Sequence, residues 1–352
     1  MMKSIVMFTI FVLVSYSSLS QTASCVQTLR LARATYEQGR LHEIESQLKP
    51  CLQGGFTKDE KQLEVEGYKL LCLSYIYLEE PEKANDAMLN ILRVDHDFQI
   101  NPAVDPAEFV GLYSTFRSKS MFSVGLIVGP NATLPTVTEN FAISGSASGQ
   151  GKYNPKVSVQ IGLVFEKYLF EKFTAAPELS LSNRAFAYTN PILFESDSNQ
   201  NTVAEQTGDI KQSWLDLNLL MQYKLGKRAL NSYVSFGPNV GVLLSATNAA
   251  ETKYRTGQAT SGSPLDIKPT YNKVGFSLIG SAGIKYKFGA VYITANIRYQ
   301  YGLSKVVDES KKSDPEATLN YGLSPNIYSQ QNIAFLFGFV APIFSPKKLN
   351  IK

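Results

Sequence analysis

The chain has 352 residues, of which 44% are hydrophobic and 18% charged, and its formal net charge at pH 7 is +4. A mean hydropathy of -0.09 excludes a membrane protein built as a bundle of apolar helices. The positive charge is small and scattered, and no basic run is interleaved with aromatic residues, which argues against a nucleic-acid partner. The length predicts two folded domains.

The first twenty residues have the three-part build of a secretory signal peptide. Lys3 precedes an apolar run over 5–14, and a small polar stretch over 15–20 follows. The apolar run is too short to span a bilayer as a helix. We therefore predict a signal peptide over 1–20. A lipid anchor on Cys25 is the disfavoured alternative, because this cysteine lies about ten residues beyond the apolar run.

An exported chain meets an oxidising compartment, where its three cysteines can form one disulfide. We favour the pair Cys25 and Cys51, which would tie the start of a predicted helical hairpin to its end. Cys72 lies in an apolar helical face and is then the free thiol. Three unpaired, buried cysteines remain the alternative.

Residues 21–118 predict a small all-α domain, because apolar residues recur there with a period near 3.6. Two helix pairs follow each other about forty residues apart. Pro81 falls at the turn inside the second pair. Corresponding positions of the two pairs are Ala32, Gly39, Ile44 and Leu48 in the first and Cys72, Glu79, Ala84 and Met88 in the second.

The run LLCLSYIYLEEPEKANDAMLNIL of the second pair resembles a tetratricopeptide repeat (TPR). The first pair is a weaker match, since Thr35 stands where an aromatic residue is usual. The resemblance implies that residues 25–118 bind a partner protein on a concave face. The alternatives are that this domain packs against the mouth of the following domain or acts as a spacer.

Residues 119–345 show the alternation of apolar and polar residues that is typical of β-strands. The clearest case is 214–224, where leucines alternate with polar residues. Long polar loops and short turns alternate between the strands, as in small outer-membrane β-barrels. Eight antiparallel strands are predicted, over residues 121–129, 156–168, 173–183, 214–225, 233–244, 274–287, 291–301 and 332–344.

Loop lengths predict which way such a barrel points. Outer-membrane barrels have short periplasmic turns and longer extracellular loops. With eight strands, both chain ends lie on the periplasmic side, so we expect the helical domain in the periplasm and a short tail over 346–352. The fold class is thus α+β multidomain, with a small TPR-like all-α domain before an eight-stranded transmembrane barrel.

A soluble barrel of the lipocalin kind is the rival interpretation, because periodicity does not say which face is outside. The composition of the two faces favours a membrane barrel. One face is bulky and aromatic, and the other is crowded with glycine and serine, which suit a narrow lumen. Examples are Phe165, Phe276, Phe335 and Phe337 on the first face, and Gly162, Ser235, Gly241 and Ser277 on the second.

The runs APELSLS, YVSFGPNVGVLL and ANIRYQYGL resemble, in order and spacing, segments of the Bacteroidetes-type (PorT-like) outer-membrane β-barrel family. The resemblance covers about residues 120–344. It implies a small closed barrel in a bacterial outer membrane, and some members of that family serve type IX secretion or gliding. The helical domain and the tail are departures from the family pattern.

No motif for catalysis or cofactor binding is present. The two histidines, His42 and His96, both lie in the helical domain, so the barrel has no histidine base to activate a serine. No P-loop, CxxC pair or dinucleotide fingerprint occurs. We therefore predict a protein that is not an enzyme and needs no cofactor or metal.

Seven charged residues of the predicted strands are expected to point into the lumen. Buried charges need partners, and an eight-stranded barrel is just wide enough for its own side chains. These residues are expected to form an ion-pair network that fills the lumen; a gated narrow pore or ligand site is the alternative. They are Glu166, Glu178, Arg184, Asp216, Lys224, Lys285 and Arg298.

The sequence thus predicts a non-enzymatic outer-membrane protein that contacts lipid through its barrel. Its helical domain, over 25–118, is expected to dock a periplasmic or outer-membrane protein, as an accessory of a secretion, gliding or envelope assembly complex. The alternative from another class is a narrow channel or small-solute porin.

Overall fold

The computed structural model describes residues 25–349 except 141–150, 171, 192–203, 227–229, 255–256, 258, 262 and 312–324. The predicted signal peptide, 1–20, lies outside the described residues. The chain divides into two compact units. The helical unit comprises Met1–Ser120 with Phe344–Lys352, and the barrel unit comprises Met121–Ile343.

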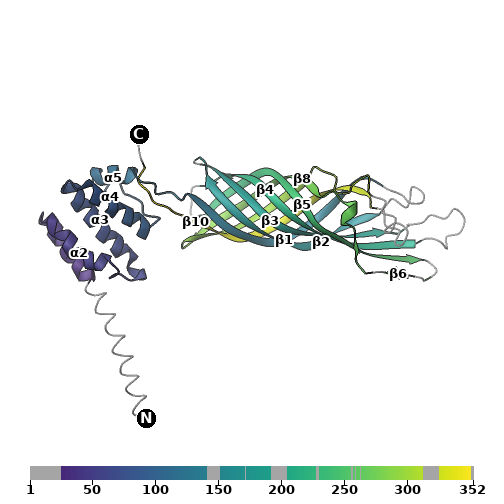
Figure 1. The fold of residues 1–352 in the computed structure, drawn as a ribbon, viewed down its shortest axis with the longest axis horizontal. Helices are drawn as coiled ribbons and strands as arrows, with labels where there is room; N and C mark the ends of the chain where they lie inside the picture. The colour runs from purple at the N-terminus through teal and green to yellow at the C-terminus, as the bar shows by residue number, and fades with distance from the viewer. Residues whose placement is uncertain are drawn as a thin grey trace, which may run out of the picture. The chain divides into compact units, whose positions relative to one another are not determined.

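The helical unit consists of short antiparallel helices around one core (Figure 1). Residues 25–37 form the first helix. Positions that correspond in the two predicted helix pairs, such as Leu48 and Met88, are fully buried. The remaining elements are η1 (Leu41–Glu43), α2 (Ile44–Leu52), η2 (Lys58–Glu60), α3 (Lys61–Tyr77), α4 (Pro81–Val94) and α5 (Ala107–Ser114).

The first helix of each pair ends in the same way. Gly39 and Glu79 both have positive φ, 75° and 57°. The next amide in each case, that of Arg40 or Glu80, donates to a carbonyl five residues back, at 3.1 Å and 2.9 Å. This is the hydrogen-bond pattern of a Schellman motif, whose left-handed position glycine fits best. The second pair therefore carries a non-glycine residue in a strained conformation.

We expect Glu79→Gly to raise the free energy of unfolding of the helical unit by about 1 kcal/mol, because glycine adopts positive φ without the clash of a Cβ. We expect the α3 and α4 amides of the full-length variant to exchange hydrogen about fivefold more slowly than those of the wild type. Gly39→Ala is the matched control and should change the stability in the opposite direction. Equal exchange in wild type and Glu79→Gly would contradict the strain.

The described C-terminal residues, 344–349, belong to the helical unit, whereas the sequence analysis expected a short tail over 346–352. Phe116 and Lys348 form an antiparallel bridge. The Leu349 amide donates to the Thr115 carbonyl at 2.7 Å. Phe344 stacks on His96 with ring centroids 4.8 Å apart. The backbone groups of this segment are thus paired with the chain just after α5, a pairing between distant segments that has no local sequence signature.

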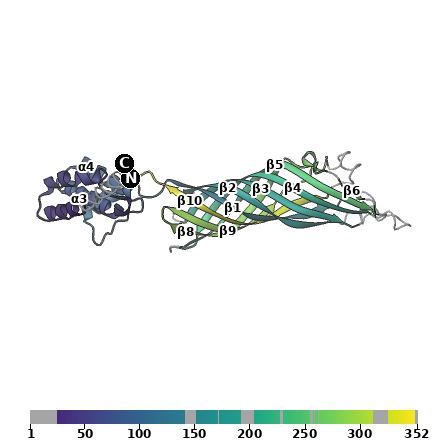
Figure 2. The same cartoon turned by 90° about the horizontal axis from the view of Figure 1, so that it is seen from below.

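The barrel unit is a closed antiparallel ring of eight strands, so this prediction is confirmed (Figures 1 and 2). Pairing of β1 with β10 closes the ring. Two short strands, β6 (Ala259–Ser261) and β7 (Leu265–Asp266), add to β5. The eight ring strands are β1 (Phe122–Glu139), β2 (Lys152–Tyr168), β3 (Phe173–Asn190), β4 (Ala204–Lys224), β5 (Leu230–Tyr254), β8 (Val274–Phe288), β9 (Val291–Gly302) and β10 (Ile327–Ile343).

The two ends of the barrel differ in their connections. At one end, called the short-turn end, β2 leads to β3, β4 to β5 and β8 to β9 within a few residues. Phe122 and Ile343, where the chain enters and leaves the barrel, pair with each other at this same end. The opposite end, called the long-loop end, carries the longer connections.

Several strands are longer than predicted, most clearly at the long-loop end. β4 begins at Ala204 instead of 214, and β5 ends at Tyr254 instead of 244. The outward side chains of β4 are polar from Glu205 to Ser213 and apolar only from Leu215 onward. The prediction therefore located the end of the apolar face and not the end of the strand. A β-bulge between Ser213 and Trp214 marks the change.

The apolar face points outward along the part of the barrel near the short turns. On β4, Leu219 is 51% exposed while its neighbour Asn218 is 1% exposed. Phe337 on β10 is 58% exposed. The lumen receives the polar and small side chains, which is the arrangement expected of a barrel surrounded by lipid.

Candidate functional site

Six of the seven predicted lumenal charges point into the barrel and lie together. They come from β2, β3, β4, β8 and β9, and the strand alternation alone directs them inward. They form three ion pairs, each between different strands. The pairs are Lys285 with Glu166 at 2.5 Å, Arg298 with Glu178 at 2.7 Å, and Arg184 with Asp216 at 2.8 Å.

The last two pairs are deeply buried, with side chains 3–7% exposed. Such pairs are stable only when hydrogen bonds satisfy the remaining polar atoms. Asn218 donates to Glu178 at 3.2 Å, and Asn239 donates to Asp216 at 3.3 Å. Asn239 also donates to Asn218 at 2.6 Å. The two ion pairs are therefore parts of one connected polar network.

Further polar contacts lie on both sides of this network. Lys285 donates to Gln222 at 2.8 Å, and Gln222 donates to Glu166 at 3.2 Å. Toward the long-loop end, Arg184 donates to Gln330 at 3.1 Å. The arginine also lies over the indole of Trp214, 4.9 Å from the ring centroid. The sequence analysis did not include these amide side chains in the predicted network, although they occupy inward positions of β4, β5 and β10.

Lys224 is the predicted lumenal residue that the structure leaves out of this network. It is half-buried at the last position of β4 and makes no ion pair with a described residue. At a strand end near the rim, water can solvate an ammonium group, so the lysine does not require a carboxylate partner.

Between the polar network and the long-loop end, the interior also contains an apolar cluster, called the plug. Tyr271 and Val307, from two long connections, form a bridge within it. The hydroxyl groups of Tyr271 and Tyr328 are 2.9 Å apart. The buried members of the plug are Phe186, Ile210, Trp214, Leu243, Ala246, Ile267, Tyr271, Val306, Val307 and Tyr328.

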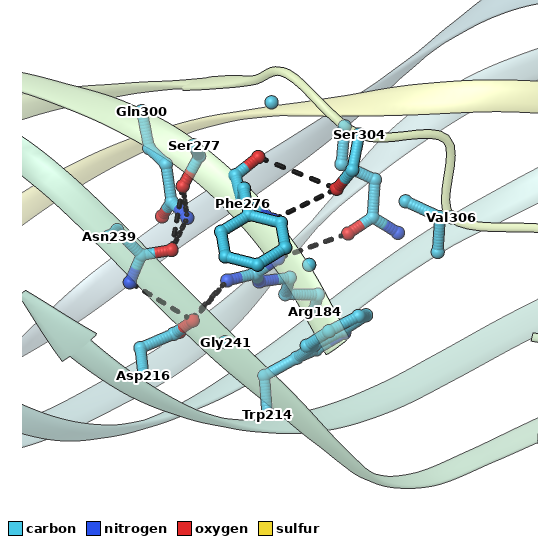
Figure 3. Close-up of a pocket in the computed structure, with 13 residues that line it drawn as sticks. Arg184, Trp214, Asp216, Asn239, Gly241, Phe276, Ser277, Gln300, Ser304 and Val306 are labelled. Atoms are coloured by element: carbon cyan, nitrogen blue, oxygen red, sulfur yellow. Dashed lines mark hydrogen bonds and ion pairs between the residues drawn. The ribbon is translucent and has the colours of Figure 1, made fainter. Parts of the chain in front are cut away.

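A small cavity lies where the network meets the plug (Figure 3). Arg184, Asp216 and Trp214 line it, and the figure shows the guanidinium reaching toward the carboxylate beside the indole. The space available to the centre of a water molecule is about 20 Å³. That is room for roughly one water and not for a substrate.

The structure joins Cys25 to Cys51 in a disulfide. Cys72 is free and fully buried in the helical core. Burial raises the pKa of the Cys72 thiol to about 12, so it remains protonated and unreactive. The disulfide therefore connects the first helix to the end of α2, and the third cysteine serves as a core residue.

The histidines form no metal site in the described part of the chain. His96 places Nδ1 2.7 Å from the Leu92 carbonyl oxygen. Within the described ranges, no group of three or more His, Cys, Asp or Glu side chains is arranged to hold a metal ion. No helix among the described residues is long and apolar enough to cross a membrane.

Comparison with known proteins places the chain in a family. The family model described as an outer membrane protein beta-barrel domain matches residues 112–308. Among solved structures, the chain is similar to OprG from Pseudomonas aeruginosa, with 14% identity, 64% of this chain and 98% of that chain covered, and a TM-score of 0.36.

It is also similar to the outer membrane protease OmpT from Escherichia coli, with 9% identity, 63% of this chain and 96% of that chain covered, and a TM-score of 0.35. The outer membrane protein AlkL gives 11% identity, 72% and 99% coverage and a TM-score of 0.31. No curated protein matches the chain. Because the family model spans more than half of the sequence, the chain belongs to the outer membrane protein beta-barrel domain family and is an outer-membrane protein.

Proposed function

We propose that this protein is a non-enzymatic outer-membrane anchor whose helical unit docks a partner protein in the periplasm. The observation that carries the proposal is the filled lumen. Three ion pairs with their amide partners occupy the middle, and the plug closes the long-loop end. The cavity between the network and the plug has room for about one water, which is too little for a substrate.

A membrane-spanning placement is supported by the outward face of the strands. On β4 the apolar outward residues extend over 215–223. This length matches the roughly 9–11 residues of a transmembrane β-strand. The rest of β4, with Asp209 and Lys211 pointing outward, would then stand outside the membrane.

The orientation follows from the turns. Short turns of outer-membrane barrels face the periplasm. The chain enters this barrel at Phe122 and leaves it at Ile343, and both residues lie at the short-turn end. The helical unit is connected to the barrel there by both chain ends and is thus periplasmic in this proposal. Its TPR-like character is supported by two helix pairs with the same Schellman ending at Gly39 and Glu79. The resemblance to PorT-like proteins suggests a secretion, gliding or envelope assembly complex as the setting.

Leu219→Arg tests the membrane placement. Leu219 is the middle outward residue of the apolar stretch on β4, and a charged side chain at the bilayer midplane of a barrel costs about 2–4 kcal/mol. We expect this loss in urea unfolding of the protein reconstituted in phospholipid vesicles. Thr207→Arg, on the same face of the same strand, should change stability by less than about 0.5 kcal/mol. Equal losses in both variants would place the membrane elsewhere.

Docking is tested by crosslinking in cells, followed by affinity purification of the full chain. A protein enriched over a control that lacks residues 25–118 is the expected result. If nothing is enriched over this control, the docking function is wrong.

The channel alternative is tested by planar-bilayer conductance of the purified protein. We expect no ohmic channels, because the ion pairs and the plug obstruct the lumen. Steady conductance that is changed by Arg298→Gln or Glu178→Gln would overturn the anchor in favour of a narrow channel.

A further inference from the structure

The helical unit carries a groove with about 350 Å³ available to the centres of water-sized molecules. It lies between the end of α3, the start of α4, α5 and the C-terminal segment. Tyr75, Ile76 and Leu112 supply apolar lining. This volume is in the range of pockets that hold small ligands or the side chains of a bound peptide. Unlike the cavity in the barrel, the groove therefore has room for an occupant.

The polar lining of the groove is dominated by hydrogen-bond acceptors. Glu79, Glu80 and Glu108 contribute carboxylates, and Lys348 is the single basic residue of the lining. Glu80 is already paired with Lys83 at 2.9 Å, whereas Glu79 and Glu108 are exposed. The Oδ1 atom of Asn85, which also lines the groove, is buried without a hydrogen-bond partner among the described residues. A hydrogen-bond donor with positive charge would therefore complement these acceptors.

The chain itself shows that an extended basic segment fits at this place. Residues 347–349 lie beside the chain that follows α5, held by backbone hydrogen bonds from Arg117 to the Lys347 carbonyl and from Leu349 to the Thr115 carbonyl. This pairing brings Lys348 to the edge of the groove. The remaining volume has room for a second basic side chain, and the exposed carboxylates can pair with its charge.

We propose that this groove binds a lysine or arginine side chain of an extended segment of the partner protein, with Glu79 and Glu108 as the recognising carboxylates and Tyr75 and Leu112 contacting the apolar stem. The proposal rests on the docking function and assigns that function a site and a partner chemistry. A basic side chain is suited to both parts of the groove, because its methylene stem is apolar and its head is charged.

The test places a photo-crosslinking amino acid at Gly111 in the full chain, expressed in cells. Gly111 lines the groove, and a Cβ added there meets no atom within 4 Å. A second crosslinking position, the exposed Leu31, reports on docking away from the groove. Mass spectrometry identifies the crosslinked segments. The capture is repeated in Glu79→Gln/Glu108→Gln and in the matched control Glu82→Gln/Asp86→Asn, whose carboxylates do not line the groove.

We expect crosslinks from Gly111 to segments that contain lysine or arginine, reduced about fivefold in the groove variant and unchanged in the control. A synthetic peptide of the captured segment should also bind purified protein more weakly at higher ionic strength. Capture from Gly111 that survives the groove variant, or that involves segments without basic residues, overturns the proposal. Crosslinks from Gly111 that reach this chain's own C-terminal residues and no partner segment also overturn it.

Capture from Leu31 with none from Gly111 overturns the groove assignment but leaves docking intact. Absence of capture from both positions contradicts the docking function, and the groove assignment is then wrong as well. Hydrogen exchange of α3 and α4 checks that the variants are folded.

Discussion

Asp216→Ala is expected to lower the free energy of unfolding of the barrel by roughly 3–5 kcal/mol, because it leaves the Arg184 guanidinium buried without a counter-charge. The two side chains are 7% and 3% exposed, so water cannot replace the carboxylate without opening the lumen. Asn239 would lose an acceptor at the same time. Urea unfolding in phospholipid vesicles, followed by the fluorescence of Trp214, measures the loss. This residue is the single tryptophan of the chain and packs on Arg184.

Two controls separate the buried pair from a general effect of removing a carboxylate. Asp209→Ala lies on the same strand and removes an exposed pair with Lys156, so it should cost less than about 1 kcal/mol. The double variant Arg184→Met/Asp216→Leu replaces both charges by apolar groups and should recover much of the loss. If Asp216→Ala unfolds at the same urea concentration as Asp209→Ala, the lumenal network does not stabilise the barrel.

The sequence predicts this network well because strand alternation is a local property. Once 214–224 is recognised as a strand with leucines on one face, Asp216 must share the other face with its i±2 neighbours. The same reasoning places Glu178 and Arg298 inward. It does not state which carboxylate meets which cation, since that depends on the register between strands. The register became known only from the pairing of the strands in space.

The plug was not predicted, for a related reason. Ile210 lies in an extension of β4 whose outward residues are polar, and the outward neighbours of Phe186 in β3 are alanines, so the bulky apolar alternation that marks a lipid-facing strand is absent there. Val306 and Tyr271 come from connections that carry no strand pattern of their own. The inside of the barrel thus gains an apolar cluster near the level where the outside of β4 changes from apolar to polar. A single rule for the whole strand could not reveal such a reversal.

The helical unit shows the same limit. Its helix pairs follow from the 3.6-residue period, and Pro81 begins α4 as expected. The pairing of Lys348 with Phe116 links segments that are distant in sequence, so no local period indicates it. That pairing brings Lys348 to the edge of the groove of the helical unit. The sequence therefore predicted a docking domain but not the groove proposed as its binding site.

Cys51→Ser is expected to lower the free energy of unfolding of the helical unit by about 3.5 kcal/mol, the loop-closure value for the sequence separation of 26 residues between the bridged cysteines. The first helix pair depends on this link. α2 has only nine residues, and Pro50 near its end has no amide to donate to the preceding turn. Guanidinium unfolding of the full chain in detergent, followed by circular dichroism at the helical band, measures the loss.

A reducing agent provides the control within the same experiment. Reduction should lower the stability of the wild-type helical unit to that of Cys51→Ser and should leave the variant unchanged, because Cys72 is buried and forms no bridge. The barrel transition should not shift in either case, since it contains no cysteine. A wild-type helical unit that unfolds identically with and without reductant would show that the disulfide does not stabilise it.

A domain of this size buries little surface, so a loss of about 3.5 kcal/mol is a large part of its folding free energy. Reduction should therefore also weaken partner capture through the groove, which links the oxidising compartment to the docking function.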